Sequence, residues 1–197
     1  MEKVRKTDRR TLYTKEVIKD ALLELEQDMS YDQINVTKIC KQAEISRATF
    51  YLHYKDMNEV LDTILEDALM FSEEEEGTLL DTLDVVKNGD AAAMKEKDAL
   101  LPACQRIADS GKYRDLFMDA GLTDYIIGKI ASHERSKVVP GLMERGGISE
   151  ADAEVIFQFI LHGSFAVNQG QYWCKTSKWY HLQELLGKFV NGGLDSI

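Results

Sequence analysis

The chain has 197 residues, 44% of them hydrophobic, and only two prolines, so it can bury a core and contains few helix breakers. Its net charge is −10, no run of about 18 apolar residues is present to span a membrane, and residues 1–10 do not resemble a secretory signal. Three cysteines without CxxC spacing fit a reducing cytoplasm. We therefore expect an all-α, cytoplasmic protein with no membrane segment.

The charge is distributed unevenly along the chain. Residues 1–60 hold 11 Lys/Arg and 11 Asp/Glu, whereas residues 61–197 hold 13 and 23. Within the neutral part, residues 1–10 and 36–55 each carry a net charge of +3. DNA binding requires local neutralisation of phosphates, so both segments are candidate DNA contacts, and the acidic remainder is expected to confine DNA to one end.

Hydrophobic spacing predicts about nine helices, no strand and no internal repeat. Asn35, Ser46, Ser149 and Ser177 are expected N-caps, and Asp56 with Glu59 resembles a capping box. The predicted helices span residues 11–27, 36–43, 47–53, 56–69, 98–109, 113–119, 123–144, 149–174 and 177–190.

Several short segments are expected to interrupt these helices. Pro140 should kink or end the helix that contains it. Residues 87–90 and 145–147 read as breaks, and the glycines of residues 191–193 should stop the last helix. The charge run of residues 73–76 is expected to be a solvated helix face.

Two short helices separated by a three-residue turn, residues 44–46, form a predicted helix-turn-helix. Ile39 and Phe50 are expected to lie on the buried side and hold the two helices at a fixed angle. The second helix would then place its outer face in the major groove of double-stranded DNA. On that face, Arg47 suits guanine, and apolar side chains suit a thymine methyl.

Hydroxyl and cationic side chains around this face suit phosphate oxygens. The residues expected to contact DNA are Thr37, Arg47, Ala48, Thr49, Tyr51, Leu52, His53 and Lys55.

Residues 34–56 resemble the DNA-binding signature of the tetracycline-repressor (TetR) family. The matching positions are Ile39, Ala43, Ser46, Thr49, Phe50, Tyr51, His53, Tyr54 and Lys55, within a likeness that covers residues 11–69. Three positions depart from the family pattern. Asn35 replaces a frequent threonine, Glu44 replaces a frequent glycine, and Met57 stands where a lysine is often found. We expect Glu44 to adopt a positive φ or the turn to differ.

The resemblance implies two domains, a DNA-binding domain of residues 1–56 and a helical effector-binding and dimerisation domain of residues 57–197. It also implies a homodimeric repressor that binds a palindromic operator and is released by a small-molecule effector, with the last two helices forming the dimer. Small residues seven apart on one face allow such helices to approach closely. The residues expected at the dimer interface are Gly163, Val167, Gly170, Trp179, Leu182 and Leu186.

Other functions remain as alternatives. A co-regulator of the same fold would act through a protein partner instead of an operator. An ordinary helical hairpin would leave Arg47 and Tyr51 without a purpose. A helical enzyme lacks support, because no nucleophile–base pair or phosphate-binding glycine loop is visible, and no metal or cofactor is expected. The large apolar residues expected mostly in the core are Met70, Phe71, Phe117, Met118, Tyr125 and Phe157, and the cysteines are interpreted as packing residues.

Overall fold

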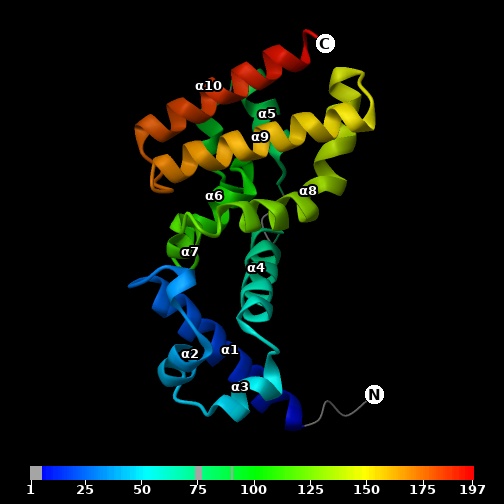
Figure 1. The fold of residues 1–197 in the computed structure, drawn as a ribbon. Helices are drawn as coiled ribbons and strands as arrows, with labels where there is room; N and C mark the ends of the chain where they lie inside the picture. Colours follow the sequence, from blue (N-terminus) through cyan, green and yellow to red (C-terminus); the bar gives the residue numbers. More distant parts are fainter. Residues whose placement is uncertain (1–5, 74–76, 90) are drawn as a thin grey trace.

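The computed structural model describes residues 6–73, 77–89 and 91–197, and these residues form ten α-helices and three short 3₁₀ turns, with no strand (Figure 1). The predicted all-α class is confirmed. The helices are α1 (Lys6–Glu26), α2 (Val36–Gln42), α3 (Arg47–His53), α4 (Met57–Glu73), α5 (Leu79–Lys87), α6 (Ala103–Asp109), α7 (Arg114–Met118), α8 (Thr123–Gly146), α9 (Glu150–Gly170) and α10 (Ser177–Leu194). The 3₁₀ turns are η1 (Tyr31–Gln33), η2 (Ala91–Lys95) and η3 (Asp98–Leu100).

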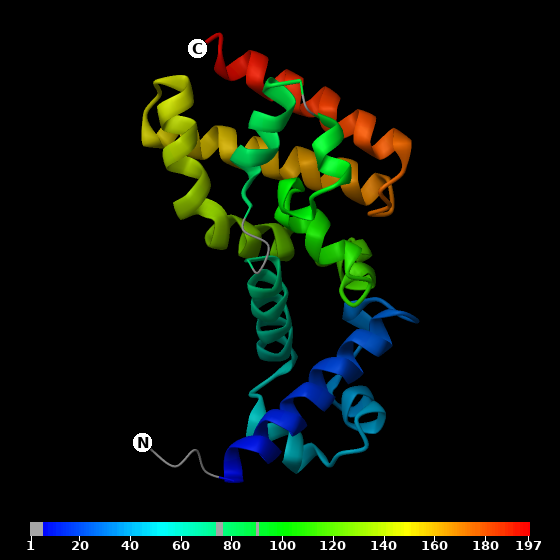
Figure 2. The same ribbon diagram turned by 180° about the vertical axis from the view of Figure 1, so that it is seen from behind.

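Helices α1, α2 and α3 pack together at one end of the molecule, which we call the head (Figure 1). Ile18, Leu22, Ile39 and Phe50 are fully buried between them. Helix α1 begins earlier than the apolar stripe predicts, at Lys6, because a helix can extend beyond the residues that it buries. The remaining helices, α5–α10, form a larger body at the other end (Figure 2).

Helix α4 connects the head to the body (Figures 1 and 2). The side chain of Asp56 caps it, accepting a hydrogen bond from the Glu59 backbone N–H at 3.0 Å, as expected, while Glu59 reaches back to the Lys55 N–H. The apolar face of α4 is buried, and the apolar core runs continuously from Ile18 in α1 to Phe165 in α9. Head and body therefore share one core.

The C-terminal end of α4 is held by a buried arginine, Arg106 of α6, which is 7% exposed. Its guanidinium donates hydrogen bonds to the backbone carbonyl oxygens of Ser72 (3.0 Å), Gly77 (3.0 Å), Ala99 (3.3 Å) and Leu101 (2.5 Å). One side chain thereby ties together three segments of backbone: the end of α4, the segment at Gly77 and the segment around η3. The predicted charge run of residues 73–76 follows α4, and residues 74–76 lie outside the described residues.

Helix α5 is the element that raises the number of helices above the predicted nine. A capping box begins it, since Thr78 Oγ1 accepts from the Leu80 N–H at 3.2 Å and Asp81 accepts from the Thr78 N–H at 2.7 Å. That Thr-x-x-Asp pattern is visible in the sequence. The predicted 98–109 helix is instead divided by Pro102, which separates η3 from α6.

Helix α8 continues through Pro140 to Gly146, and Figures 1 and 2 show that it is bent along its length. Pro140 was expected either to kink the helix or to end it. The kink agrees with the structure, because the helix continues beyond Pro140. Gly147 follows with φ of 62°, the left-handed conformation that ends helices. The predicted break at residues 145–147 is confirmed.

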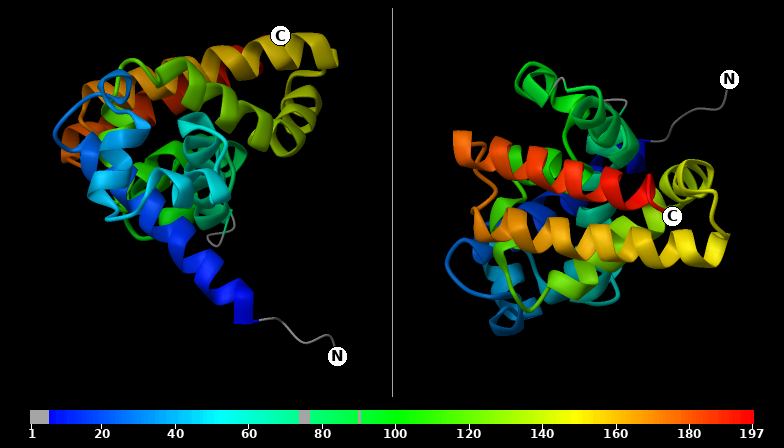
Figure 3. Two further views of the ribbon diagram at one scale, coloured as in Figure 1. Left: turned by 60° about the horizontal axis from the view of Figure 1, so that its bottom comes forward. Right: turned by 90° about the horizontal axis from the view of Figure 1, so that it is seen from above.

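The last two helices lie side by side on the outside of the body (Figure 3, right). Ser149 caps α9 as predicted, but α9 ends at Gly170, four residues before the expected Cys174. Thr176, not Ser177, caps α10. The glycines at 192 and 193 do not stop α10, because Asn191 is buried and donates to the Leu83 carbonyl oxygen at 2.8 Å, which fixes this end of the helix against α5.

Of the residues expected in the core, Phe117 and Phe157 are buried and Met118 is partly buried. Met70 (65%), Phe71 (45%) and Tyr125 (38%) are instead exposed. Met70 and Phe71 lie on the side of α4 that faces away from the shared core. None of the helices described here combines the length and apolar character needed to cross a bilayer.

Candidate nucleic-acid interface

The helix-turn-helix is formed by α2 and α3, and each helix starts with the predicted cap. Asn35 Oδ1 accepts a hydrogen bond from the Lys38 N–H at 3.0 Å, and Ser46 Oγ accepts from the Thr49 N–H at 3.0 Å. Each cap satisfies a backbone donor that has no partner within its helix. The caps therefore define where both helices begin.

The turn between the helices has an unusual backbone at Glu44, whose φ is +52°. This is the conformation expected from the glycine that the family pattern has at this position. The Ile45 N–H donates to the Cys40 carbonyl oxygen at 3.0 Å, which closes the turn. The structure thus keeps the turn geometry and places a strained residue in it.

Glu44→Gly is expected to raise the free energy of unfolding by about 1 kcal/mol, because glycine adopts a positive φ without the steric penalty of a Cβ. Urea denaturation followed by circular dichroism measures the change. Glu66→Gly, at an exposed position inside α4, is the control and should lower stability by about 1 kcal/mol. Equal losses in both variants would contradict the assignment of strain to Glu44.

The outer face of α3 presents most of the residues expected to contact DNA. Arg47 and Ala48 are exposed, Tyr51 is 51% exposed and Leu52 is 80% exposed. The Arg47 guanidinium lies 6.0 Å from the centre of the Tyr51 ring, and that ring packs edge-on against the buried Phe50 at 5.4 Å. Tyr51 and Arg47 are therefore neighbours on one exposed surface, with Phe50 fixing the ring from beneath.

The surrounding polar residues are more varied. Thr37 and Lys55 are exposed, whereas Thr49 and His53 are half-buried. The Thr49 hydroxyl lies 2.9 Å from Ser46 Oγ, so it is already engaged in the N-cap. Thr37 is on α2, Lys55 follows α3, and the other six expected residues are on α3 itself.

The basic side chains of residues 1–10 and 36–55 differ in whether they are free to contact DNA. Lys38, counted in the segment of residues 36–55, donates from Nζ to the Gln33 carbonyl oxygen at 2.7 Å. Arg9 and Arg10 are exposed at the start of α1. Of the remaining basic residues in that first segment, Lys3 and Arg5 lie outside the described residues. Lys38 is therefore already engaged within the head, whereas Arg9 and Arg10 are exposed.

Helices α9 and α10 expose a second surface, the α9/α10 face, which is apolar. Its large exposed side chains are Val155 (69%), Phe159 (64%), Leu185 (54%) and Phe189 (66%). A hollow of about 490 Å³ lies beside the two phenylalanines. Of the residues expected at a dimer interface, Gly163 and Gly170 are exposed and Val167, Leu182 and Leu186 are partly exposed.

Trp179 was expected at the dimer interface, and this expectation is wrong. Its side chain is fully buried within its own chain and so is not available to a partner. Its Nε1 donates to Asn168 Oδ1 at 2.8 Å, and the same oxygen accepts from Gln183 Nε2 at 2.9 Å. The indole packs with Val86, Met94 and Leu101 in a separate small core beneath α10. Trp179 holds α10 to the body.

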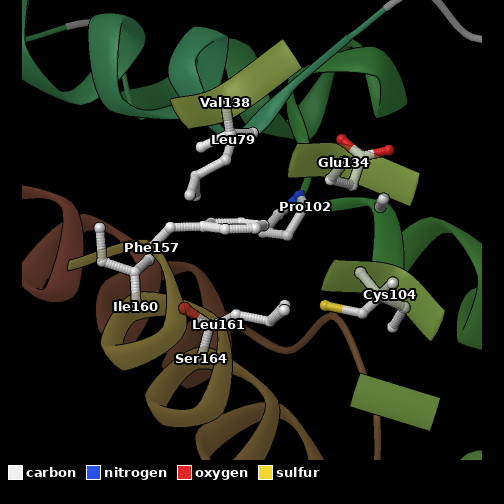
Figure 4. Close-up of a pocket in the computed structure, with 11 residues that line it drawn as sticks. Leu79, Pro102, Cys104, Glu134, Val138, Phe157, Ile160, Leu161 and Ser164 are labelled. Carbon is white, nitrogen blue, oxygen red and sulfur yellow. The ribbon is translucent and has the colours of Figure 1, made fainter. Parts of the chain in front are cut away.

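A small cavity lies between α6, α8 and α9 (Figure 4). Its volume is about 30 Å³, room for about two water molecules. The ring of Phe157 occupies the middle of the view, and Cys104 and Glu134 lie on the side opposite α9 (Figure 4). Burial raises the pKa of the Cys104 thiol to about 11, so it is protonated at neutral pH.

No group of three or more His, Cys, Asp or Glu side chains within the described ranges is placed to hold a metal ion. Cys40 and Cys104 are buried and Cys174 is exposed, and all three are free thiols. Cys40 and Cys104 fit the packing role expected for all three cysteines, whereas the exposed Cys174 does not.

Comparisons with known proteins agree with this architecture. No protein-family model matches the chain. A Bacillus subtilis (strain 168) protein named HTH-type transcriptional regulator YxbF is 29% identical over 101 residues, which is 51% of this chain and 25% of that protein. The chain therefore matches only about a quarter of that relative's length.

Among solved structures, the fold is similar to that of the dihydroxyacetone kinase operon activator DhaS. The TM-score is 0.50 at 15% identity, and the likeness covers 94% of this chain and 98% of that chain. This likeness shows a shared all-helical fold over nearly the whole length of both chains.

Proposed function

We propose that the protein is a DNA-binding transcriptional regulator of the tetracycline-repressor type. The observation that carries this proposal is the exposed face of α3, where Arg47, Tyr51 and Leu52 stand on a helix fixed by Ser46 and Phe50. Both relatives are named as transcription regulators and neither as an enzyme, which supports a non-enzymatic role.

We further propose two domains, residues 1–56 for DNA binding and residues 57–197 for dimerisation and effector binding, and a homodimer formed through the α9/α10 face. Exposed aromatic side chains such as Phe159 and Phe189 favour burial against a partner. A dimer would present two copies of α3 to a palindromic operator, with the half-sites about one DNA turn or a multiple apart. The acidic body would repel the phosphates and keep DNA at the head.

The proposed output is repression, relieved by a small molecule that binds in the body. The cavity beside Phe157 is the candidate entry point, and it must enlarge to admit an effector, since typical ligand sites measure about 300–1,000 Å³. An effector relieves repression only if it binds the DNA-incompetent conformation more tightly than the competent one.

Selection of bound DNA from a random pool, followed by electrophoretic shift, tests the DNA-binding role. We expect a palindromic site whose affinity falls steeply with salt, because each neutralised phosphate contributes a slope of about −0.9 in log K against log salt. Arg47→Ala should weaken binding at least ~10-fold and relax the base preference at one position of each half-site, whereas Lys55→Ala should weaken all sequences alike.

Glu66→Ala, a charge removed from an exposed position in α4, is the matched control and should leave affinity unchanged. If no DNA is enriched and pull-down recovers a protein partner instead, the co-regulator alternative replaces this proposal. Transcription from the selected site, with and without the protein, distinguishes repression from activation.

A further inference from the structure

An acidic pocket lies where the head meets the body. One wall comes from the end of α1 and η1, and the other from α7 and the segment that joins it to α8. Figures 1 and 2 both show α7 directly against this end of the head. The volume of the pocket is about 530 Å³, and it is lined mainly by Glu26, Asp32, Asp115, Asp119, Met29 and Met118.

The charged side chains that line this pocket are all acidic. Four carboxylates line it, two from the head and two from the body, and no lysine, arginine or histidine is among the lining residues. The basic group at its edge is Lys38, whose Nζ lies 3.4 Å from Met29 Sδ and is engaged by the Gln33 carbonyl oxygen. Nothing in the lining neutralises the carboxylates.

Some of these carboxylates have structural partners. Asp119 accepts from the Tyr31 N–H and from the Gly121 N–H, both at 2.7 Å, and so joins head to body. Asp32 accepts from the Ser30 hydroxyl. Both oxygens of Asp119 are thus engaged by backbone donors.

Glu26 differs from the others. It is 8% exposed, and its Oε1 is buried without a hydrogen-bond partner among the residues described. Burial raises the pKa of Glu26 to about 8, and the charges of Asp119, Asp115 and Asp32 add to that rise. An unsatisfied buried acceptor costs about 1–3 kcal/mol, more when charged, so this site favours a donor that carries positive charge.

The carboxylates that line this pocket favour an amine over a metal ion as the ligand. Metal ions such as Mg²⁺ need several oxygens in fixed positions, and no suitable group of three is found in the described parts of the chain. An alkylammonium carries three N–H donors and an apolar stem. Its ammonium group suits the carboxylates, and its methylene groups suit the Met29 and Met118 walls.

We propose that this pocket binds a small alkyl amine in its cationic form, held by Glu26 and Asp32 of the head and by Asp115 and Asp119 of the body. The bound cation would attract carboxylates that otherwise repel each other across the junction. It would therefore draw the end of α1 towards α7 and fix the angle of the head. The inference goes beyond the proposed function, and its test needs no DNA.

Isothermal titration of the full chain with putrescine (1,4-diaminobutane), at pH 7 and constant ionic strength, tests the proposal. We expect saturable binding with a dissociation constant below about 1 mM. Because the pKa of Glu26 is about 8 and the cation favours the ionised carboxylate, binding should release close to one proton per site, measured by titration in buffers of different ionisation enthalpy.

Glu26→Gln should weaken putrescine binding at least ~10-fold and abolish the proton release, since it removes one charge contact and the titrating group. This variant keeps the size of the side chain and is uncharged, as Glu26 with its pKa of about 8 mostly is at pH 7, so we expect the fold to be retained. Asp28→Asn is the matched control, because Asp28 is an exposed carboxylate near the same helix end and is absent from the pocket lining.

The proposal is overturned if putrescine shows no saturable binding up to about 10 mM, ten times the expected limit. Equal loss of affinity in the Asp28 and Glu26 variants would also overturn it, as would tighter binding of Mg²⁺ than of putrescine. 1,4-Butanediol, the uncharged analogue, should not bind.

Discussion

Phe159→Glu is expected to convert the proposed dimer to a monomer and to weaken binding to the proposed operator at least ~100-fold. Phe159 is 64% exposed on the α9/α10 face and lines the hollow there. In the proposed dimer, a two-fold axis brings each substituted residue close to its copy, so two carboxylates would be buried without partners. Loss of the dimer lowers DNA affinity because a monomer can occupy only one half-site at a time.

Sedimentation velocity measures the oligomeric state, and electrophoretic shift measures affinity for the selected DNA. Met70→Glu is the matched control, because Met70 is similarly exposed, at 65%, but lies on α4 away from this face. That variant should remain dimeric and bind DNA normally. A Phe159→Glu protein that sediments as a dimer would show that the α9/α10 face is not the interface.

Arg106→Met is expected to lower the free energy of unfolding by about 3–5 kcal/mol. Methionine fills similar space but donates no hydrogen bonds, so the four carbonyl oxygens that Arg106 serves lose its guanidinium. Urea denaturation measures the loss, and limited proteolysis is expected to show earlier cleavage near the end of α4, where Ser72 is released.

Arg135→Met is the control for removing an arginine charge. Arg135 is half exposed and pairs with Glu150 and Glu154 at the surface, at 2.8 and 2.7 Å. Exposed ion pairs contribute little to stability because solvent screens them. A stability loss in the Arg135 variant as large as that in the Arg106 variant would mean that the backbone contacts of Arg106 are not the cause.

The helix-turn-helix could be predicted from sequence because its determinants are close together in the chain. Asn35 and Ser46 cap the helices that directly follow them, and Phe50 lies within one turn of the residues it supports. The positive φ at Glu44 could also be expected, because the family pattern has glycine there. Local hydrogen bonds and periodicity are sufficient for this region.

The body could not be predicted to the same depth, because contacts distant in sequence decide its details. Trp179 is buried and donates a hydrogen bond to Asn168. The hydrophobic periodicity of α10 alone does not show which of its faces packs against the body. Asn191 binds the carbonyl oxygen of Leu83, 108 positions away, and α10 therefore continues where glycines predicted an end. Met70 and Phe71 were assigned to the core by residue type, although α4 turns them outward.

Helix α4 also has the geometry of a lever. Its 17 residues at about 1.5 Å each give an arm of about 25 Å, anchored at the Ser72 end by Arg106 and carrying the head at the other end. A tilt of about 10° about the anchor displaces the far end by about 4 Å, which exceeds the rise of about 3.4 Å per base on one DNA strand. A small movement in the body that tilted α4 would thus be amplified into a change of register at DNA bound in the proposed way.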